Sequence, residues 1–370
     1  LSCKSTSTMH HGMLGWQLVA LAVVLAYSTG AAGAVTTRVP SLAKAVKGQK
    51  LTLGVEVNHA DVPAPPERGY GVSIHHQNLY DKSEQELRSI PIRQMSEELR
   101  EAKSSCIAVR GMGELLECIP EEQAEAKGSF PGPRPILYVP PVDEDAADLD
   151  VDALSGKGVS GVLLATSTVL PPAASLEEVD AALESLKAPV EAVSKAGMEP
   201  VIELSFEAGE DAPIWDEDAA EDVLKRIEEL TGASVVVMSP RGSAVVPVPA
   251  SFKGRVLSSV RVPWTRINDL CDDLRANGYA GALLRSECMP MAAQEFQDWS
   301  GFWKGVIASA RSNKSKNVSM MVAAQQQKDA MAAYIQKVKA SGQFGDAGTG
   351  ASLGGDDAIN TERGDYLGFG

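Results

Sequence analysis

The chain has 370 residues, of which 44% are apolar and 22% charged, proportions that are ordinary for a folded globular protein. Its formal net charge of −15 argues against a nucleic-acid-binding protein, because neutralising phosphates requires clustered Lys and Arg. Between Asp143 and Glu229 there are 23 acidic residues and only five basic ones. A solvated surface is the simpler interpretation of this acidic stretch, and a docking face for a basic partner is the alternative.

The first predicted element is a membrane-spanning helix within residues 1–37. No charged residue occurs from Ser5 to Thr37, and the apolar segment Met13–Val35 is long enough to cross a bilayer. Only Lys4 precedes this segment, whereas four basic residues follow it: Arg38, Lys44, Lys47 and Lys50. By the positive-inside rule we predict a retained anchor, with the rest of the chain in the cytosol or stroma. The alternative is a secretory signal that is cleaved after Ala34 and releases a secreted barrel.

The histidines and cysteines give little evidence of metal or redox chemistry. His10 and His11 lie at the start of the hydrophobic segment; in a photosynthetic membrane they are candidate chlorophyll ligands, and two interfacial polar residues are the simpler alternative. The other three histidines precede residue 105, so we expect no histidine chemistry in the α/β domain. The cysteines lack paired CxxC spacing, which predicts structural thiols and no metal site (Cys3, Cys106, Cys118, Cys271, Cys288).

Residues 38–104 are predicted to be a linker and a helical approach segment. They contain a short β-like run at 51–57, a Pro-rich break (VPAPPERG) and a charged helical pattern at 82–103 that Pro91 interrupts.

Regular alternation of strands and helices defines the domain 105–310. Short apolar runs predict strands at 106–109, 135–139, 161–165, 201–204, 234–238, 255–260 and 281–284. Helical patterns lie between them at 176–196, 218–230, 264–277 and 295–310, the first with a capping box from Ser175 to Glu178. This order predicts right-handed βαβ units and a parallel sheet, which is either doubly wound or closed into a TIM-type (βα)₈ barrel; we favour the barrel, in a divergent or incomplete form. The usual dinucleotide and P-loop motifs are absent.

Residues 311–370 are predicted to be a helix at 320–340 and a Gly- and Asp-rich flexible tail at 341–370. The aromatic residues Phe344, Tyr366 and Phe369 make this tail a candidate docking segment, and an idle tail is the alternative.

From Pro135 to Met289 the chain resembles indole-3-glycerol-phosphate synthase, a (βα)₈ barrel. The resemblance covers PILYVPPV as the third strand, KGVSGVLLATSTV as the fourth, KAGMEPVIELS as the fifth and GASVVVMSPRGS as the sixth. GRVLSSVRV resembles the seventh strand, and PWTRINDLCDDLRANGYAGALLRSECM resembles the last crossover helix and eighth strand. The family closes an indole ring with a lysine general acid, proton-shuttling carboxylates and Gly-rich amides that hold a phosphate.

Few of those functional residues are present here. Glu203 matches the strand-five glutamate, Glu287 the acidic residue after strand eight, Arg241 an arginine after strand six, and Arg110 keeps a positive charge near strand one. The lysine position holds Val139, and the remaining family positions hold other residues (Ser239, Pro240, Ser259, Arg261, Ser286). The resemblance therefore implies a pseudoenzyme in which Glu203, Arg241, Glu287 and Arg110 are relics.

Together these features predict a non-catalytic, membrane-anchored accessory subunit of a plastid thylakoid photosynthetic complex, with the barrel on the stromal side. Its partners would be membrane proteins that contact residues 10–35 and 341–370. No cofactor is expected in the barrel, and chlorophyll is the candidate cofactor at the N-terminal helix. The alternative is an active lyase on a phosphorylated aromatic substrate, with Glu203 and Glu287 as proton-transfer groups and Arg110 or Arg241 on the phosphate.

Overall fold

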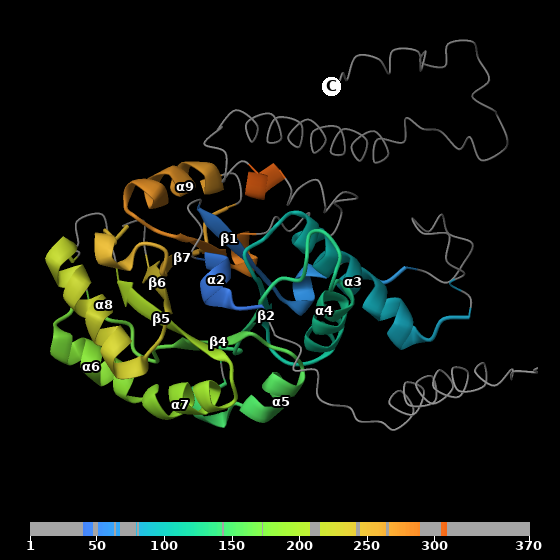
Figure 1. The fold of residues 1–370 in the computed structure, drawn as a ribbon, viewed down its shortest axis with the longest axis horizontal. Coiled ribbons are helices and arrows are strands. Elements are labelled where there is room, and N and C mark those ends of the chain that lie inside the picture. The colour runs from blue at the N-terminus through green and yellow to red at the C-terminus, as the bar shows by residue number, and fades with distance from the viewer. Residues whose placement is uncertain are drawn as a thin grey trace, which may run out of the picture.

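The computed structural model describes residues 40–46, 51–62, 64–66, 79, 81–142, 144–171, 173–207, 215–241, 245–263, 266–288 and 305–308. They contain a closed barrel of eight parallel strands, each hydrogen-bonded to the next along the chain, with β8 paired to β1 (Figure 1). The strands are β1 Thr52–Val57, β2 Ile107–Arg110, β3 Ile136–Val139, β4 Gly161–Ala165, β5 Glu199–Glu207, β6 Val235–Arg241, β7 Val256–Val260 and β8 Gly281–Leu284. The predicted TIM-type barrel is confirmed, and it is complete.

Helices surround the barrel and connect its strands (Figure 1). They are α3 Glu84–Glu101, α4 Glu114–Glu125, α5 Val151–Gly156, α6 Leu176–Glu184, α7 Lys187–Lys195, α8 Glu217–Thr231 and α9 Ile267–Ala276. Four 3₁₀ turns add to these: η1 His59–Asp61, η2 Ala146–Asp148, η3 Ala250–Phe252 and η5 Ser286–Cys288. Residues 305–308 are helical, and Val306 and Ile307 are buried against the outer core.

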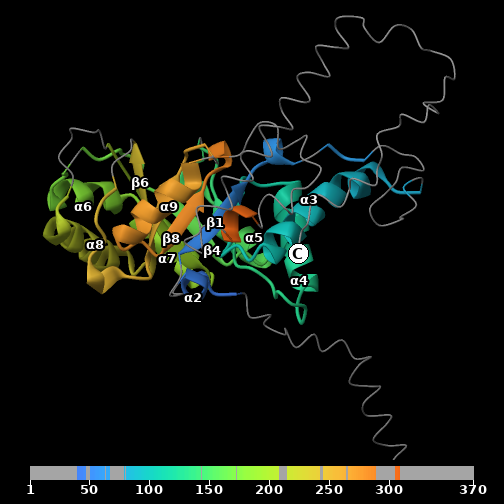
Figure 2. The ribbon, with the colours of Figure 1, turned by 90° about the horizontal axis from the view of Figure 1, so that it is seen from above.

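Most of the strands are short apolar runs because both of their faces are buried. Alternate side chains point outward to the helices and inward to the barrel axis. The inward set forms a separate cluster that includes Leu137, Val201 and Leu257. The short helix α2 Leu42–Val46 closes the N-terminal end of this cluster, where Leu42 and Val46 are fully buried (Figure 2).

The barrel begins earlier than the predicted domain 105–310. The run at 51–57 is β1, which pairs with β2 and β8, so residues 38–104 supply the first strand and its crossover helix rather than only a linker. Cys106–Val109 therefore lies at the second strand, not the first. The break expected at Pro91 is also wrong, because α3 runs through it with the proline ring buried.

The predicted helix 176–196 is two helices, α6 and α7, separated at Ser185 and Leu186. Its capping box is confirmed, since Ser175 accepts from the Glu178 amide and Glu178 accepts from that of Ser175. No helix within the described residues is long and apolar enough to cross a membrane. The predicted anchor at 13–35, the helix at 320–340 and the tail at 341–370 lie outside the described residues.

Candidate functional site at the C-terminal end of the barrel

The carboxyl ends of all eight strands meet at one end of the barrel, the end where TIM-barrel enzymes carry their active sites. Side chains inside such a barrel form layers from alternate strands. The strand register places Glu56, Val139, Glu203 and Ser259 in one layer, directly above apolar layers. The barrel axis therefore changes from apolar to charged at this level.

Two carboxylates and two guanidinium groups form a continuous chain across this end. Arg110 Nε donates to Glu56 Oε1 at 2.6 Å, and Arg285 Nε lies 2.7 Å from Glu56 Oε2. The second contact is an ion pair rather than an aligned hydrogen bond, because neither atom meets hydrogen-bond geometry. Arg285 Nη1 then donates to both carboxylate oxygens of Glu203 at 3.3 Å. We call these four residues the ion-pair chain.

The ion-pair chain is electrically balanced and mostly inaccessible. Glu56 is fully buried, Glu203 and Arg285 are each only 3% exposed, and Arg110 is partly exposed. Burial by itself lowers the pKa of the Arg110 guanidinium, but the hydrogen bond and charge of Glu56 outweigh it, so this pKa is raised. Each of the two buried carboxylates therefore has a cationic partner inside the barrel.

Several side chains form a rim outside the ion-pair chain. Asn58 caps η1, and Asp61 accepts from the Asn58 amide at 2.8 Å. Burial, with smaller contributions from the charges of Glu56 and Glu287, raises the pKa of Asp61 to about 6 despite the lowering effect of the Asn58 amide. On the outward face of β3, beneath the connection that follows it, the Tyr138 hydroxyl donates to Glu144 at 3.0 Å, and burial raises the pKa of this hydroxyl.

The structure brings together only part of the predicted residue set. Glu203 and Arg110 both belong to the ion-pair chain, although they do not contact each other directly. Glu287, on η5, is exposed and close enough to influence Arg110 and Asp61. Arg241 is exposed at the end of β6. Val139, at the lysine position of the resembled family, is buried and packs with the inner core. His10 and His11 lie outside the described residues.

Sequence reasoning missed Glu56, Arg285 and His59. Glu56 is the inward-facing acid of the run TLGVEV, two residues after an inward glycine, and Arg285 directly follows the buried strand GALL. Both residues are charged and occupy positions that continue the inward-facing alternation of a buried strand, and this pattern could have identified them from the sequence. His59 precedes the predicted domain 105–310 in the sequence, but it follows β1 and its ring lies near Gly113 at the mouth of the barrel.

None of the four described cysteines has a pKa lowered toward neutrality. Burial raises the pKa of the Cys106, Cys271 and Cys288 thiols to about 12, and it also raises the pKa of the partly exposed Cys118. Among the described residues, no three His, Cys, Asp or Glu side chains are grouped to hold a metal ion.

Comparison with known proteins does not assign the chain to a family. No protein-family model matches the chain, and no curated protein matches it. The chain is a TIM-type barrel. An archaeal fructose-1,6-bisphosphate aldolase is similar at a TM-score of 0.40 and 13% identity over 74% of this chain and all of that one. A Rubisco-like protein from Rhodopseudomonas palustris has a TM-score of 0.37 and 11% identity over 73% of this chain and 68% of that one. The barrel assignment rests on the closed order of β1–β8, and these likenesses do not single out indole-3-glycerol-phosphate synthase.

Proposed function

We propose that the chain is a non-catalytic accessory subunit, held at a membrane by residues 1–37, in which the barrel serves as a scaffold. The observation that carries this proposal is the ion-pair chain. It occupies the position of a TIM-barrel active site and engages both buried carboxylates with arginines.

The geometry disfavours acid–base chemistry at the barrel centre. A general base needs a free lone pair close to the proton that it removes, and a general acid needs a proton to give. Glu56 contacts two arginines, and Glu203 receives two donor contacts from Arg285. Val139 supplies no proton where the resembled family has its lysine. The centre is therefore better suited to holding strands together than to turning over a substrate.

The cellular setting is part of the same proposal. A cytosolic or stromal barrel agrees with the basic residues that follow the hydrophobic segment. The resemblance to a family that is plastid-located in eukaryotes supports a thylakoid photosynthetic complex, with the barrel on the stromal side. In this setting residues 10–35 and 341–370 would contact partner proteins, and His10 or His11 would ligate chlorophyll.

Membrane extraction tests the proposal. We expect the full chain to stay with the membrane fraction after a carbonate wash and to migrate with a large complex on a native gel. Cross-linking in the native membrane should then join residues 10–35 and 341–370 to partner subunits. Recovery of the chain as a soluble monomer would contradict the proposal.

A second candidate function is a lyase acting on a phosphorylated aromatic substrate at the rim. Asp61 favours it, because a carboxyl group with a pKa of about 6 can exchange a proton near neutral pH, and the partly exposed Arg110 could meet a phosphate. This candidate predicts turnover of an anthranilate-derived phosphate by the purified chain. Asp61→Asn and Glu203→Gln should each abolish that turnover, whereas Arg88→Ala, at an exposed arginine of α3, should leave it unchanged and serves as the control.

A further inference from the structure

The connections at the N-terminal end of the barrel carry a charge opposite to that of the whole chain. Seven described connections lead from a helix or 3₁₀ turn into β2–β8, and all lie at this end. They contain six basic residues and no acidic one: Lys103, Lys127, Arg134, Lys157, Lys253 and Arg255. These connections are basic in a chain of net charge −15; Lys157 and Arg255 are paired with Glu117 of α4 and Glu228 of α8, and we call the surface formed by the seven connections the basic end.

The same end presents the most exposed aromatic side chain of the described residues. Phe130, in the connection from α4 to β3, is 90% exposed. The Lys103 ammonium lies 5.5 Å from the centroid of its ring, and Lys127 lies three residues before it. An exposed ring between lysines is the arrangement that proteins place at the boundary between lipid and water.

The exposed Phe130 belongs to a connection that is firmly held. The buried Arg100 donates to the Pro131 carbonyl at 3.0 Å and pairs with Glu122 at 3.0 Å. Four residues after Phe130, the Arg134 amide donates to Gln123 Oε1 at 2.7 Å, and before the ring the Ser129 amide donates to the Ala126 carbonyl at 3.0 Å. Hydrogen bonds before and after Phe130 therefore hold the loop that projects this apolar ring into solvent.

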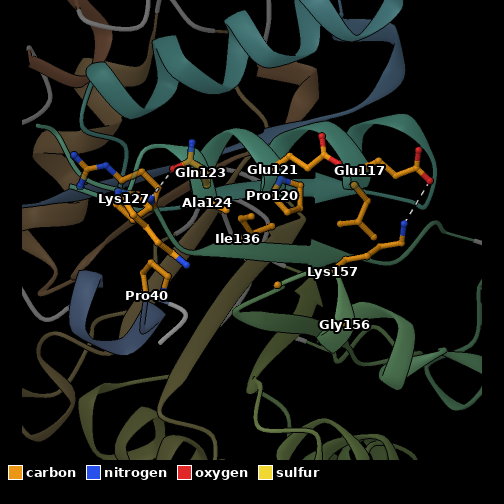
Figure 3. Close-up of a pocket in the computed structure, with 14 residues that line it drawn as sticks. Pro40, Glu117, Pro120, Glu121, Gln123, Ala124, Lys127, Ile136, Gly156 and Lys157 are labelled. Atoms are coloured by element: carbon orange, nitrogen blue, oxygen red, sulfur yellow. Dashed lines mark hydrogen bonds and ion pairs between the residues drawn. The ribbon is translucent and has the colours of Figure 1, made fainter. Parts of the chain in front are cut away.

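The chain leaves the barrel toward its hydrophobic segment beside this loop. Pro40, the first described residue, lines a groove of about 420 Å³ between α4 and α5, together with Lys127 and Arg134. Figure 3 shows Pro40 and Lys127 at the same end of the groove. The acids of α4 in this groove are paired, Glu117 with Lys157 and Glu121 with Arg93. Pro40 therefore lies beside the connection from α4 to β3, which carries Phe130.

From these observations we infer that the basic end of the barrel lies on the surface of an anionic membrane, with Phe130 in the lipid interface and Lys103 and Lys127 against the headgroups. The inference rests on the proposed function and extends it by naming the surface that faces the bilayer. Anionic lipid attracts basic residues close to its surface, and the connection 140–150 after β3, which carries five acids and no base at the opposite end of the barrel, would face away.

A depth measurement with two tryptophan variants tests the inference. Phe130→Trp is compared with Val142→Trp, a matched control that is 92% exposed and lies at the opposite end of the barrel, after β3. The full chain is reconstituted in phosphatidylcholine vesicles with roughly one third anionic phosphatidylglycerol and with brominated acyl chains. Quenching is measured as the difference from the unsubstituted chain, which removes the signal of the five native tryptophans.

We expect quenching of Trp at position 130 that is roughly twofold or more stronger than at position 142, since only the former reaches the acyl boundary. Adding Lys103→Glu and Lys127→Glu should remove most of that difference. Equal quenching at both positions, with the chain retained after a carbonate wash, would overturn the inference and leave the anchor intact. If carbonate releases the chain but Trp at position 130 is strongly quenched, the proposed membrane anchor is wrong and the membrane-facing surface is supported. If carbonate releases the chain and no quenching is seen, both the anchor and the membrane-facing surface are wrong.

Discussion

The two ends of the barrel differ in charge, in burial and in how their polar groups are used. At the C-terminal end, oppositely charged side chains are buried inside the barrel and form ion pairs. The connection after β3 at this end carries several acidic residues and no basic one. At the N-terminal end, α2 closes an apolar interior, and basic side chains lie on the connections outside it. In an ordinary TIM-barrel enzyme the C-terminal end carries the function. Here the arrangement supports our proposals that ion pairs stabilise this end from inside the barrel and that the opposite end contacts a membrane surface.

The largest expected effect is the loss of Arg285. Arg285→Ala would leave Glu203 and one oxygen of Glu56 without their cationic partner inside the barrel. Removing one member of a buried pair costs about 3–5 kcal/mol, because the remaining charge stays desolvated. Chemical denaturation should show a fall of this size in the free energy of unfolding. Arg241→Ala, at an exposed arginine, should change it by less than about 0.5 kcal/mol. Similar effects for the two variants would show that the ion-pair chain is not structural.

Arg100→Ala should have the next largest effect, at the opposite end. Arg100 is buried between α3 and α4, where it pairs with Glu122 and holds the Pro131 carbonyl. We expect a loss of about 3 kcal/mol, together with faster hydrogen exchange in residues 128–134. Arg88→Ala removes an exposed pair on the same helix and is the control, with an expected loss below about 1 kcal/mol. Unchanged exchange in this loop would mean that Arg100 does not fix Phe130.

A smaller, pH-dependent effect is expected at Asp61. Its pKa is raised from 3.8 to about 6, so the folded state binds the proton more tightly than the unfolded state does. The stabilisation is fully present below about pH 4 and is lost as the pH rises through about 6. Asp61→Asn keeps an acceptor for the Asn58 amide and should be more stable than the parent at pH 7.5 by about 1 kcal/mol, a value reduced for partial exposure.

Thermal unfolding at pH 4 and pH 7.5 checks this prediction. The difference between Asp61→Asn and the parent chain should appear at the higher pH and nearly vanish at the lower one. A larger advantage at pH 4 than at pH 7.5 would contradict the assigned pKa direction.

The contrast between the two ends also explains how much the sequence could predict. Strands such as Gly161–Ala165 and Gly281–Leu284 are predicted to the residue because each is an apolar run between clear breaks. β1 has the same character, but a Pro-rich stretch and a long interval separate it from the regular alternation, so the pattern alone assigns it to a linker. Only barrel closure, which pairs β1 with β8, reveals its place.

The residues of the candidate site are likewise only partly predictable from the sequence. Glu203 and Arg110 are recognisable from the sequence as charges in or after predicted strands. Their partners Glu56 and Arg285 lie on β1 and just after β8, which are far apart in the chain and become neighbours only when the barrel closes. The pairing that removes these groups from solvent is therefore a property of the closed sheet, and periodicity in a single strand cannot predict it.

The central claim is tested most directly by a variant in which half of the ion-pair chain is replaced by neutral residues. The assembly and phenotype of this variant are measured in the native membrane. Glu203→Gln with Arg285→Met removes one charge of each sign and leaves the Glu56–Arg110 pair at 2.6 Å in place. Such charge-balanced replacement is expected to be nearly neutral for stability. If the barrel is a scaffold, the double variant should accumulate, migrate with the large complex on a native gel and support the same cellular phenotype as the parent. Normal accumulation and assembly with loss of the phenotype would show that these residues perform chemistry.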